Sequence, residues 1–172
     1  MELKSLPEPA VLVDALADPA KRWEAFTDLD ALGPDALPAV CDGLRHGNWQ
    51  VRRWCAIHLD RHADPESLRA LVPLLRDPKG KVRLWAVHSI SCEHCRDDPN
   101  PIDVVPLLIE RIEQDESIRV RRMATAMLAV IRPDARAVPV LERLERDEEE
   151  EPKLRRHAAA ALARYRVAGL GR

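Results

Sequence analysis

The chain has 172 residues, of which 46% are hydrophobic, 33% are charged and only 3% are aromatic. This length and composition are sufficient for one domain with an aliphatic core. The formal net charge of −2 disfavours a general polyanion-binding protein, which would be strongly basic. The first residues show no signal-peptide pattern and no apolar run approaches about 18 residues, so we expect neither export nor a membrane span. With four cysteines and no export signal, the expected location is the reducing cytoplasm.

A sequence pattern recurs through most of the chain. A short apolar segment with a proline occurs four times, with the prolines spaced by 35, 33 and 33 residues, at 37–40, 72–75, 105–108 and 138–141. Each is followed by a second segment in which an aliphatic residue precedes an arginine, at 51–55, 82–86, 120–124 and 154–158. Self-similarity at this period is typical of solenoid proteins, in which each repeat is one small supersecondary unit.

The second segments predict helices with one buried face. In the first of them, Val51, Cys55 and Leu59 are spaced by four residues, which places them on one side of a helix. The same positions are aliphatic or small in the other three repeats. A divergent repeat precedes these four, so the repeats are predicted, in chain order, at 8–33, 34–62, 64–95, 100–131 and 133–166. The sequence therefore predicts an all-α, right-handed α-solenoid of about five helix pairs, in a single domain over residues 1–172.

Prolines mark several of the predicted helix boundaries. Asp64 before Pro65 and Asn100 before Pro101 both match an N-cap residue followed by a proline in the first helical turn. Pro73 lies eight residues after Pro65, within the same first helix. A proline in a helix interior removes a hydrogen bond, so this helix either begins late or bends at Pro73.

At these residues the sequence resembles HEAT repeats, and most closely the short type named after phycocyanobilin lyases. The resemblance rests on the proline of the first helix, on Asp77 and Asp115 five residues before the aligned valines, and on the pattern Val-Arg-x-x-Ala-x-x-x-Leu of the second helix. It implies that first helices line the convex side and second helices the concave side. It also implies that the repeated arginine pairs with the turn aspartate of an adjacent repeat. These arginines are Arg52, Arg83, Arg121 and Arg155.

The first candidate site is a ladder of large side chains. Each lies three residues after the aliphatic residue that begins a second segment. The ladder consists of Trp54, Trp85, Met123 and His157. It is flanked by arginines one position earlier and by two further residues three positions later: Arg53, Arg122, Arg156, Ile57 and His88. Trp and Arg are enriched at binding surfaces, so we predict that these residues bind a protein or peptide partner in the concave groove. In the alternative interpretation, each Trp packs between adjacent second helices.

Histidines and cysteines form a second candidate site. Cys92 and Cys95 make a Cys-x-x-Cys pair, and His88 lies four residues before Cys92. Thiolate and imidazole suit zinc, although a second Cys-x-x-Cys pair is missing, and ordinary or redox-sensitive thiols are the alternative. Apart from zinc at this loop, no cofactor is expected. His58 and His62 are also four residues apart, but His58 lies beside the buried stripe and is predicted to be a core histidine with satisfied hydrogen bonds.

Charged segments and catalytic motifs add little to these two candidates. Basic residues at the starts of the second helices could hold phosphates, but the acidic residues outnumber the basic ones in the whole chain. The acidic run at 148–151 is expected to be a solvated turn. No nucleophile elbow or phosphate-binding loop is present. The sequence contains no indication of the oligomeric state.

The sequence thus favours a non-enzymatic HEAT-repeat scaffold that binds a protein or peptide partner, with nucleic acid as a less favoured partner and no role at a membrane. One alternative is a nucleic-acid-binding protein or an enzyme similar to the DNA glycosylases of HEAT-like architecture, in which Trp54, Trp85 and Asp60 would act by analogy. A third interpretation is a bilin lyase-like protein, which only the repeat itself supports.

Overall fold

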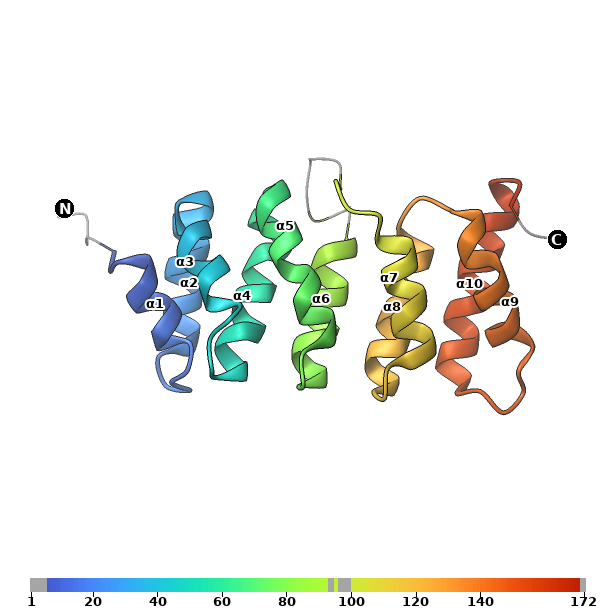
Figure 1. The fold of residues 1–172 in the computed structure, drawn as a ribbon, viewed down its shortest axis with the longest axis horizontal. Coiled ribbons are helices and arrows are strands. Elements are labelled where there is room, and N and C mark those ends of the chain that lie inside the picture. The colour runs from blue at the N-terminus through green and yellow to red at the C-terminus, as the bar shows by residue number, and fades with distance from the viewer. Residues whose placement is uncertain (1–5, 93–94, 96–99, 171–172) are drawn as a thin grey trace. The chain divides into compact units, whose positions relative to one another are not determined.

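The computed structural model describes residues 6–92, 95 and 100–170, and these residues form ten α-helices and no strand (Figure 1). The α-helices are α1 (Pro9–Ala15), α2 (Arg22–Leu32), α3 (Leu37–Gly43), α4 (Trp49–His62), α5 (Pro65–Leu71), α6 (Gly80–Ser91), α7 (Val104–Gln114), α8 (Ile118–Val130), α9 (Val138–Arg146) and α10 (Pro152–Val167). Short 3₁₀ helices occur at η1 (Gly33–Ala36), η2 (Val72–Arg76) and η4 (Ala135–Ala137). The predicted all-α fold of about five helix pairs is confirmed. Among these helices, none combines the length and the apolar character that crossing a membrane requires.

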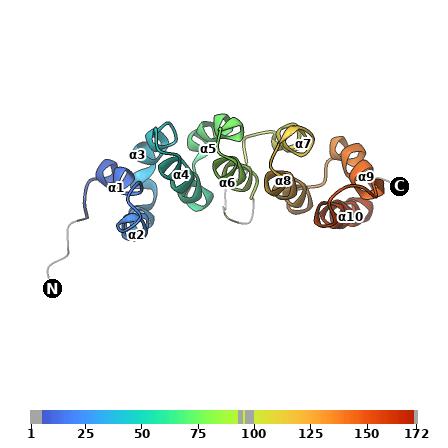
Figure 2. The same cartoon turned by 90° about the horizontal axis from the view of Figure 1, so that it is seen from below.

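Two compact units divide the chain, Met1–Ser89 (unit 1) and Ile90–Arg172 (unit 2). In unit 1, α1, α3 and α5 form one layer and α2, α4 and α6 form the other (Figure 2). In unit 2, α8 packs against α7 and α10, and α9 packs against α10. Each unit is therefore built from helix pairs, as in an α-solenoid. That the whole chain forms a single domain stays a prediction.

The aliphatic stripe predicted for the second helices is buried. On α4 and α8, the three residues of the stripe, spaced by four positions, have no exposed surface. They are Val51, Cys55 and Leu59 on α4 and Val120, Ala124 and Leu128 on α8. Removing this much apolar surface from water is the main stabilising contribution in a protein with so few aromatic residues. The helix periodicity of the sequence therefore identified the core face correctly.

Helix boundaries follow the proline signals in one case and depart from them in another. Asp64 caps α5, because its side chain accepts a hydrogen bond from the Ser67 amide at 2.7 Å and Pro65 occupies the first helical turn. The α-helix ends at Leu71 and a 3₁₀ segment with Pro73 follows, so the chain changes helix type at that proline. The boundary predicted at Asn100 is wrong. There the side chain donates to the Ile90 carbonyl at 2.6 Å, and α7 begins only at Val104.

Three of the repeated arginines bind backbone or acidic groups near the turns. Arg52 donates through Nε to Asp77 Oδ2 at 2.6 Å and through Nη2 to Asp77 Oδ1 at 3.1 Å, and both side chains are largely buried. This is the pairing with the turn aspartate of the next repeat that the family resemblance implies. Arg83 donates to the Asp77 carbonyl at 2.8 Å, and Arg121 donates to the Ile112 carbonyl at 2.9 Å. These arginines therefore hold the turns of the repeats in place.

Gly43, at the end of α3, allows a close approach between helices of unit 1. A Cβ atom at this position would lie 2.5 Å from Cys55 Sγ and 2.8 Å from Val13 Cγ1, distances too short for real contacts. We therefore expect Gly43→Ala to lower the free energy of unfolding by about 1–3 kcal/mol, because the packed side chains must shift to admit the methyl group. Urea denaturation followed by circular dichroism measures this change.

Gly47→Ala is the matched control for this substitution. No heavy atom lies within 4 Å of the Cβ position at Gly47, and its φ is not in the left-handed region. Alanine there should leave the stability unchanged or raise it by less than about 1 kcal/mol, because it restricts the unfolded chain. Equal losses of stability in the two variants would contradict the packing argument for Gly43.

Candidate functional site

Three aromatic side chains from α2 and α4 form a cluster in unit 1, named here the aromatic cluster: Trp23, Phe26 and Trp54. The ring centroids of Phe26 and Trp54 are 4.9 Å apart, and Trp23 lies 6.2 Å from Phe26 and 6.4 Å from Trp54. These tilted and edge-on arrangements are the favoured geometries of aromatic pairs. Within the described part of the chain, Trp54 Nε1 is buried without a hydrogen-bond partner. Trp54 thus packs between adjacent second helices, while part of its ring remains exposed.

Trp23 is the exposed member of the aromatic cluster, with 70% of its surface accessible to solvent. In the same cluster, the Arg53 guanidinium carbon lies 5.3 Å from the centre of the Trp54 ring, which is a cation–π contact. Burial, and then the charge of Arg22, lower the pKa of Arg53. The sequence-based ladder omitted Trp23, because it lies in the divergent first repeat and aligns with Arg53 rather than with Trp54.

The other predicted residues of unit 1 lie on α4 and α6. Ile57 is half-buried on α4, and Trp85 and His88 lie together on α6 with ring centroids 5.5 Å apart, edge to face. His88 Nδ1 is 3.0 Å from Asp60 Oδ1 on α4, so this histidine is oriented by a carboxylate of the preceding repeat. The structure therefore places Trp85 and His88 in one half-exposed patch.

The predicted residues of unit 2 lie on α8 and α10. Arg122 donates through Nε to Glu151 Oε2 at 2.8 Å, and His157 Nδ1 is 3.3 Å from the Arg122 carbonyl oxygen. Met123 is half-buried and Arg156 is exposed. Because Arg122 is already ion-paired, Arg156 is the more accessible guanidinium of the two.

The acidic run at 148–151 is only partly solvated, so the prediction of a solvated turn is wrong for two of its members. Glu150 accepts a hydrogen bond from Arg121, and Glu151 caps α10 by accepting from the Leu154 amide at 2.8 Å. The hydrogen bond from Arg122 is the main cause that lowers the pKa of Glu151 to about 2, with desolvation opposing it. These acids hold the start of α10 against α8.

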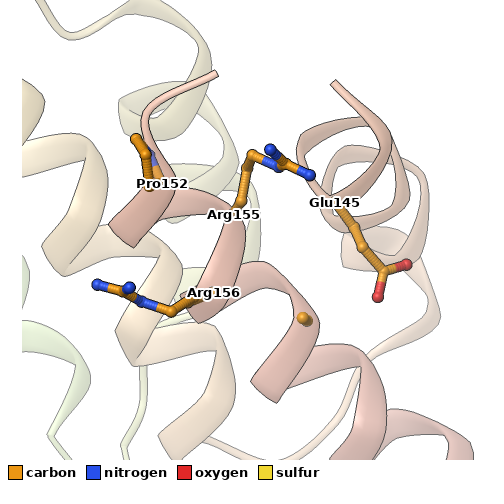
Figure 3. A pocket seen from close by; sticks show the side chains of 5 residues that line it. Glu145, Pro152, Arg155 and Arg156 are labelled. Carbon is orange, nitrogen blue, oxygen red and sulfur yellow. The ribbon is translucent and has the colours of Figure 1, made fainter. Parts of the chain in front are cut away.

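A pocket of about 340 Å³ lies beside α10 in unit 2 and is lined by Glu145, Pro152, Arg155, Arg156 and Ala159. Figure 3 shows the guanidinium groups of Arg155 and Arg156 pointing in opposite directions, and the Glu145 carboxylate pointing away from Arg155. An anion-binding site needs donors that converge on one point. This pocket therefore lacks the arrangement that would hold a phosphate.

The two cysteines of the second candidate site lie close together. Cys92 is buried directly after α6, Cys95 is half-buried, and their Sγ atoms are 2.8 Å apart as free thiols. His88, the third predicted ligand, contacts Asp60 as described above. The structure thus brings the two thiols together, and zinc binding by His88, Cys92 and Cys95 stays a prediction.

Comparisons with known proteins identify the repeat. Residues 9–91 and 103–169 match the family of HEAT repeats. No curated protein matches the sequence. Among solved structures, the chain is similar to an engineered protein from the Northeast Structural Genomics Consortium, with a TM-score of 0.59 and 19% identity over 94% of this chain and 81% of the other. This similarity concerns the fold alone, and the closer resemblance to the phycocyanobilin-lyase type stays a prediction. Because the matched residues cover most of the sequence, the chain belongs to the HEAT-repeat family.

Proposed function

We propose that the chain is a non-enzymatic HEAT-repeat module that binds a peptide segment of a protein partner. The proposed contact surface is the second-helix layer of unit 1, centred on Trp23. The supporting observation is that 70% of the Trp23 surface is exposed while its ring is held by Phe26 and Trp54. A large aromatic group that is both exposed and held in place binds at a low entropic cost, and Trp is one of the residues enriched at interface hot spots.

The charge around Trp23 indicates what kind of peptide fits. The Arg53 guanidinium lies over the Trp54 ring of the aromatic cluster, and the positive charge of Arg22 adds to burial in lowering the pKa of Arg53. Arg22 already donates to the Leu16 carbonyl at 2.7 Å, but Arg53 forms no ion pair with any carboxylate of the described residues. An acidic side chain of a ligand would relieve this repulsion. We therefore propose a peptide with an apolar residue next to Asp or Glu.

Trp54 and Trp23 have different roles in this proposal. The ring centroids of Trp54 and Phe26 are 4.9 Å apart, so truncating Trp54 removes packing between α2 and α4 as well as any ligand contact. Trp23 is mostly exposed, so truncating it should remove a ligand contact at little cost to stability. Trp23→Ala therefore separates binding from folding, which Trp54→Ala does not.

A peptide selection on the purified chain tests the proposal. A random peptide library displayed on phage should yield ligands that combine an apolar residue with Asp or Glu. We expect Trp23→Ala to weaken binding of these peptides by about thirtyfold or more, which corresponds to about 2 kcal/mol at a hot spot. Arg53→Gln should weaken binding less, and its effect should decrease at high salt. Fluorescence anisotropy of labelled peptides measures both changes.

Val167→Ala is the control, because Val167 is also an exposed apolar residue, with 91% of its surface accessible, but lies on α10. It should leave peptide affinity unchanged. The proposal is wrong if no peptide is enriched, or if selected peptides bind the Trp23→Ala variant as tightly as the wild type. Salt-dependent binding of duplex DNA that exceeds peptide binding would instead favour the nucleic-acid alternative.

A further inference from the structure

A histidine pair and a carboxylate meet on α2 and α4 in unit 1, where the His58 ring also lies edge-on to Phe26 of the aromatic cluster. Asp30 lies on α2, and His58 and His62 lie one turn apart on α4. One potential ligand atom from each residue lies within 4.8 Å of the other two. His62 Nε2 is 2.8 Å from Asp30 Oδ1, and the two imidazole rings stack with centroids 4.6 Å apart. Two nitrogen donors and one oxygen donor thus converge from adjacent repeats.

His58 is buried but not satisfied, contrary to the sequence-based prediction. Only 1% of its surface is exposed, and neither ring nitrogen has a hydrogen-bond partner within the described residues. A buried polar group without a partner costs about 1–3 kcal/mol, whereas a phenylalanine of similar shape would pack there without this cost. The stacked His62 ring and the edge-on Phe26 ring explain how His58 is packed, but they do not satisfy its nitrogens. The His58 nitrogens are therefore available to a ligand.

The electrostatic surroundings keep His58 in the form that binds metals. Burial of the His58 ring favours the neutral imidazole, which offers a lone pair to a cation. Asp30 supplies the negative charge that a divalent ion requires.

We propose that Asp30, His58 and His62 form a binding site for a divalent transition metal of the zinc class. Two imidazoles and one carboxylate are a ligand set that zinc uses, with histidines one helical turn apart supplying two of the bonds. Tetrahedral zinc with bonds of about 2.0–2.1 Å places its ligand atoms about 3.3 Å apart. The ligand atoms lie within 4.8 Å of one another, so they must move closer together to bind zinc. The stacked rings must also rotate, because each imidazole lone pair lies in its ring plane.

The site is also open to solvent on one side. The Asp30 and His62 side chains are 34% and 22% exposed, so the ion can enter from solvent and a water can complete its coordination. Arg61 competes for Asp30, with its Nη1 3.7 Å from Asp30 Oδ2, but its side chain is 62% exposed and can move away. A bound ion would tie α2 of the first repeat to α4 of the second.

Zinc titration of the full chain tests the site, with a chromogenic chelator as competitor. The Cys92→Ser/Cys95→Ser variant serves as the background, because it removes the two cysteine ligands of the other predicted site. We expect this variant to bind one equivalent of zinc. The melting temperature should rise by about 5 °C or more when free zinc is about a hundredfold above its Kd. Cobalt bound in place of zinc should show no sulfur-to-metal charge-transfer band, because the ligands are nitrogen and oxygen.

Two ligand variants decide the outcome. His62→Gln removes a half-buried ligand and should fold normally, and His58→Phe keeps an aromatic ring in the buried position. Each should weaken zinc binding by about a hundredfold or more, since even substitutions that only support a ligand cost about 10–100-fold. His157→Gln, in unit 2, is the control and should bind zinc as the background does.

Three results would overturn the proposal. The first is that the Cys92→Ser/Cys95→Ser background binds no zinc. The second is that His58→Phe and His62→Gln fold, as judged by circular dichroism, and bind zinc as tightly as the background. The third is a cobalt spectrum dominated by sulfur ligation in the wild type together with loss of all binding in the background. That last result would assign metal binding to the cysteines alone.

Discussion

Replacing Leu128 with aspartate is expected to unfold unit 2 at room temperature. Leu128 lies on α8 with no exposed surface, in the helix that packs against both α7 and α10. The substitution loses the burial of a leucine side chain and places a carboxylate where no partner is available. Together these effects cost more than about 5 kcal/mol, which is comparable to the total stability of a domain of this size. Loss of helical circular dichroism and of cooperative urea unfolding would show this result.

Val167→Asp is the matched control, because it introduces the same charge in unit 2 on a residue that is 91% exposed. Its effect on stability should stay within about 0.5 kcal/mol. Leu128→Ala should give an intermediate loss of about 2–5 kcal/mol, since it creates a cavity without burying a charge. An unchanged melting temperature of Leu128→Asp would mean that the buried face of α8 is wrongly assigned.

The second large effect is expected from removing Asp77. Its carboxylate accepts two hydrogen bonds from Arg52 and one from the Lys79 amide, at 2.8 Å, and it is only 7% exposed. Asp77→Ala leaves the Arg52 guanidinium, 14% exposed, without its counter-ion. Breaking a buried pair from one side typically costs about 3–5 kcal/mol, and the turn also loses the contact to Lys79. Chemical denaturation measures the change in the free energy of unfolding.

An exposed pair in the same unit provides the control for Asp77. Arg45 and Asp42 are 2.7 Å apart, with side chains 73% and 79% exposed, so Asp42→Ala should cost only about 0–1 kcal/mol. The double variant Arg52→Met/Asp77→Leu should recover much of the loss, because it removes the unpaired charge together with its partner. Similar losses of unfolding free energy in Asp42→Ala and Asp77→Ala would show that burial does not increase the contribution of the Arg52–Asp77 pair to stability.

The sequence alone was sufficient for the fold and for the core face. The repeated prolines, the stripe of Val51, Cys55 and Leu59, and the cap at Asp64 are local patterns, and each corresponds to a helix feature of the structure. Such patterns are readable because a helix position and its burial depend on neighbours three or four residues away. The pairing of Arg52 with Asp77 was also foreseeable, because the resemblance to HEAT repeats implies it.

Only the tertiary structure decided how the candidate residues are partnered. Trp23 and Trp54 are 31 positions apart, Arg122 and Glu151 are 29 apart, and Asp30 and His62 are 32 apart, so each contact joins two adjacent repeats. Periodicity places a side chain on a face, but it does not determine which rotamer and which neighbouring helix complete the contact. For this reason the sequence correctly predicted that His58 is buried, while its unsatisfied nitrogens became visible only once Asp30 and His62 were in place around it.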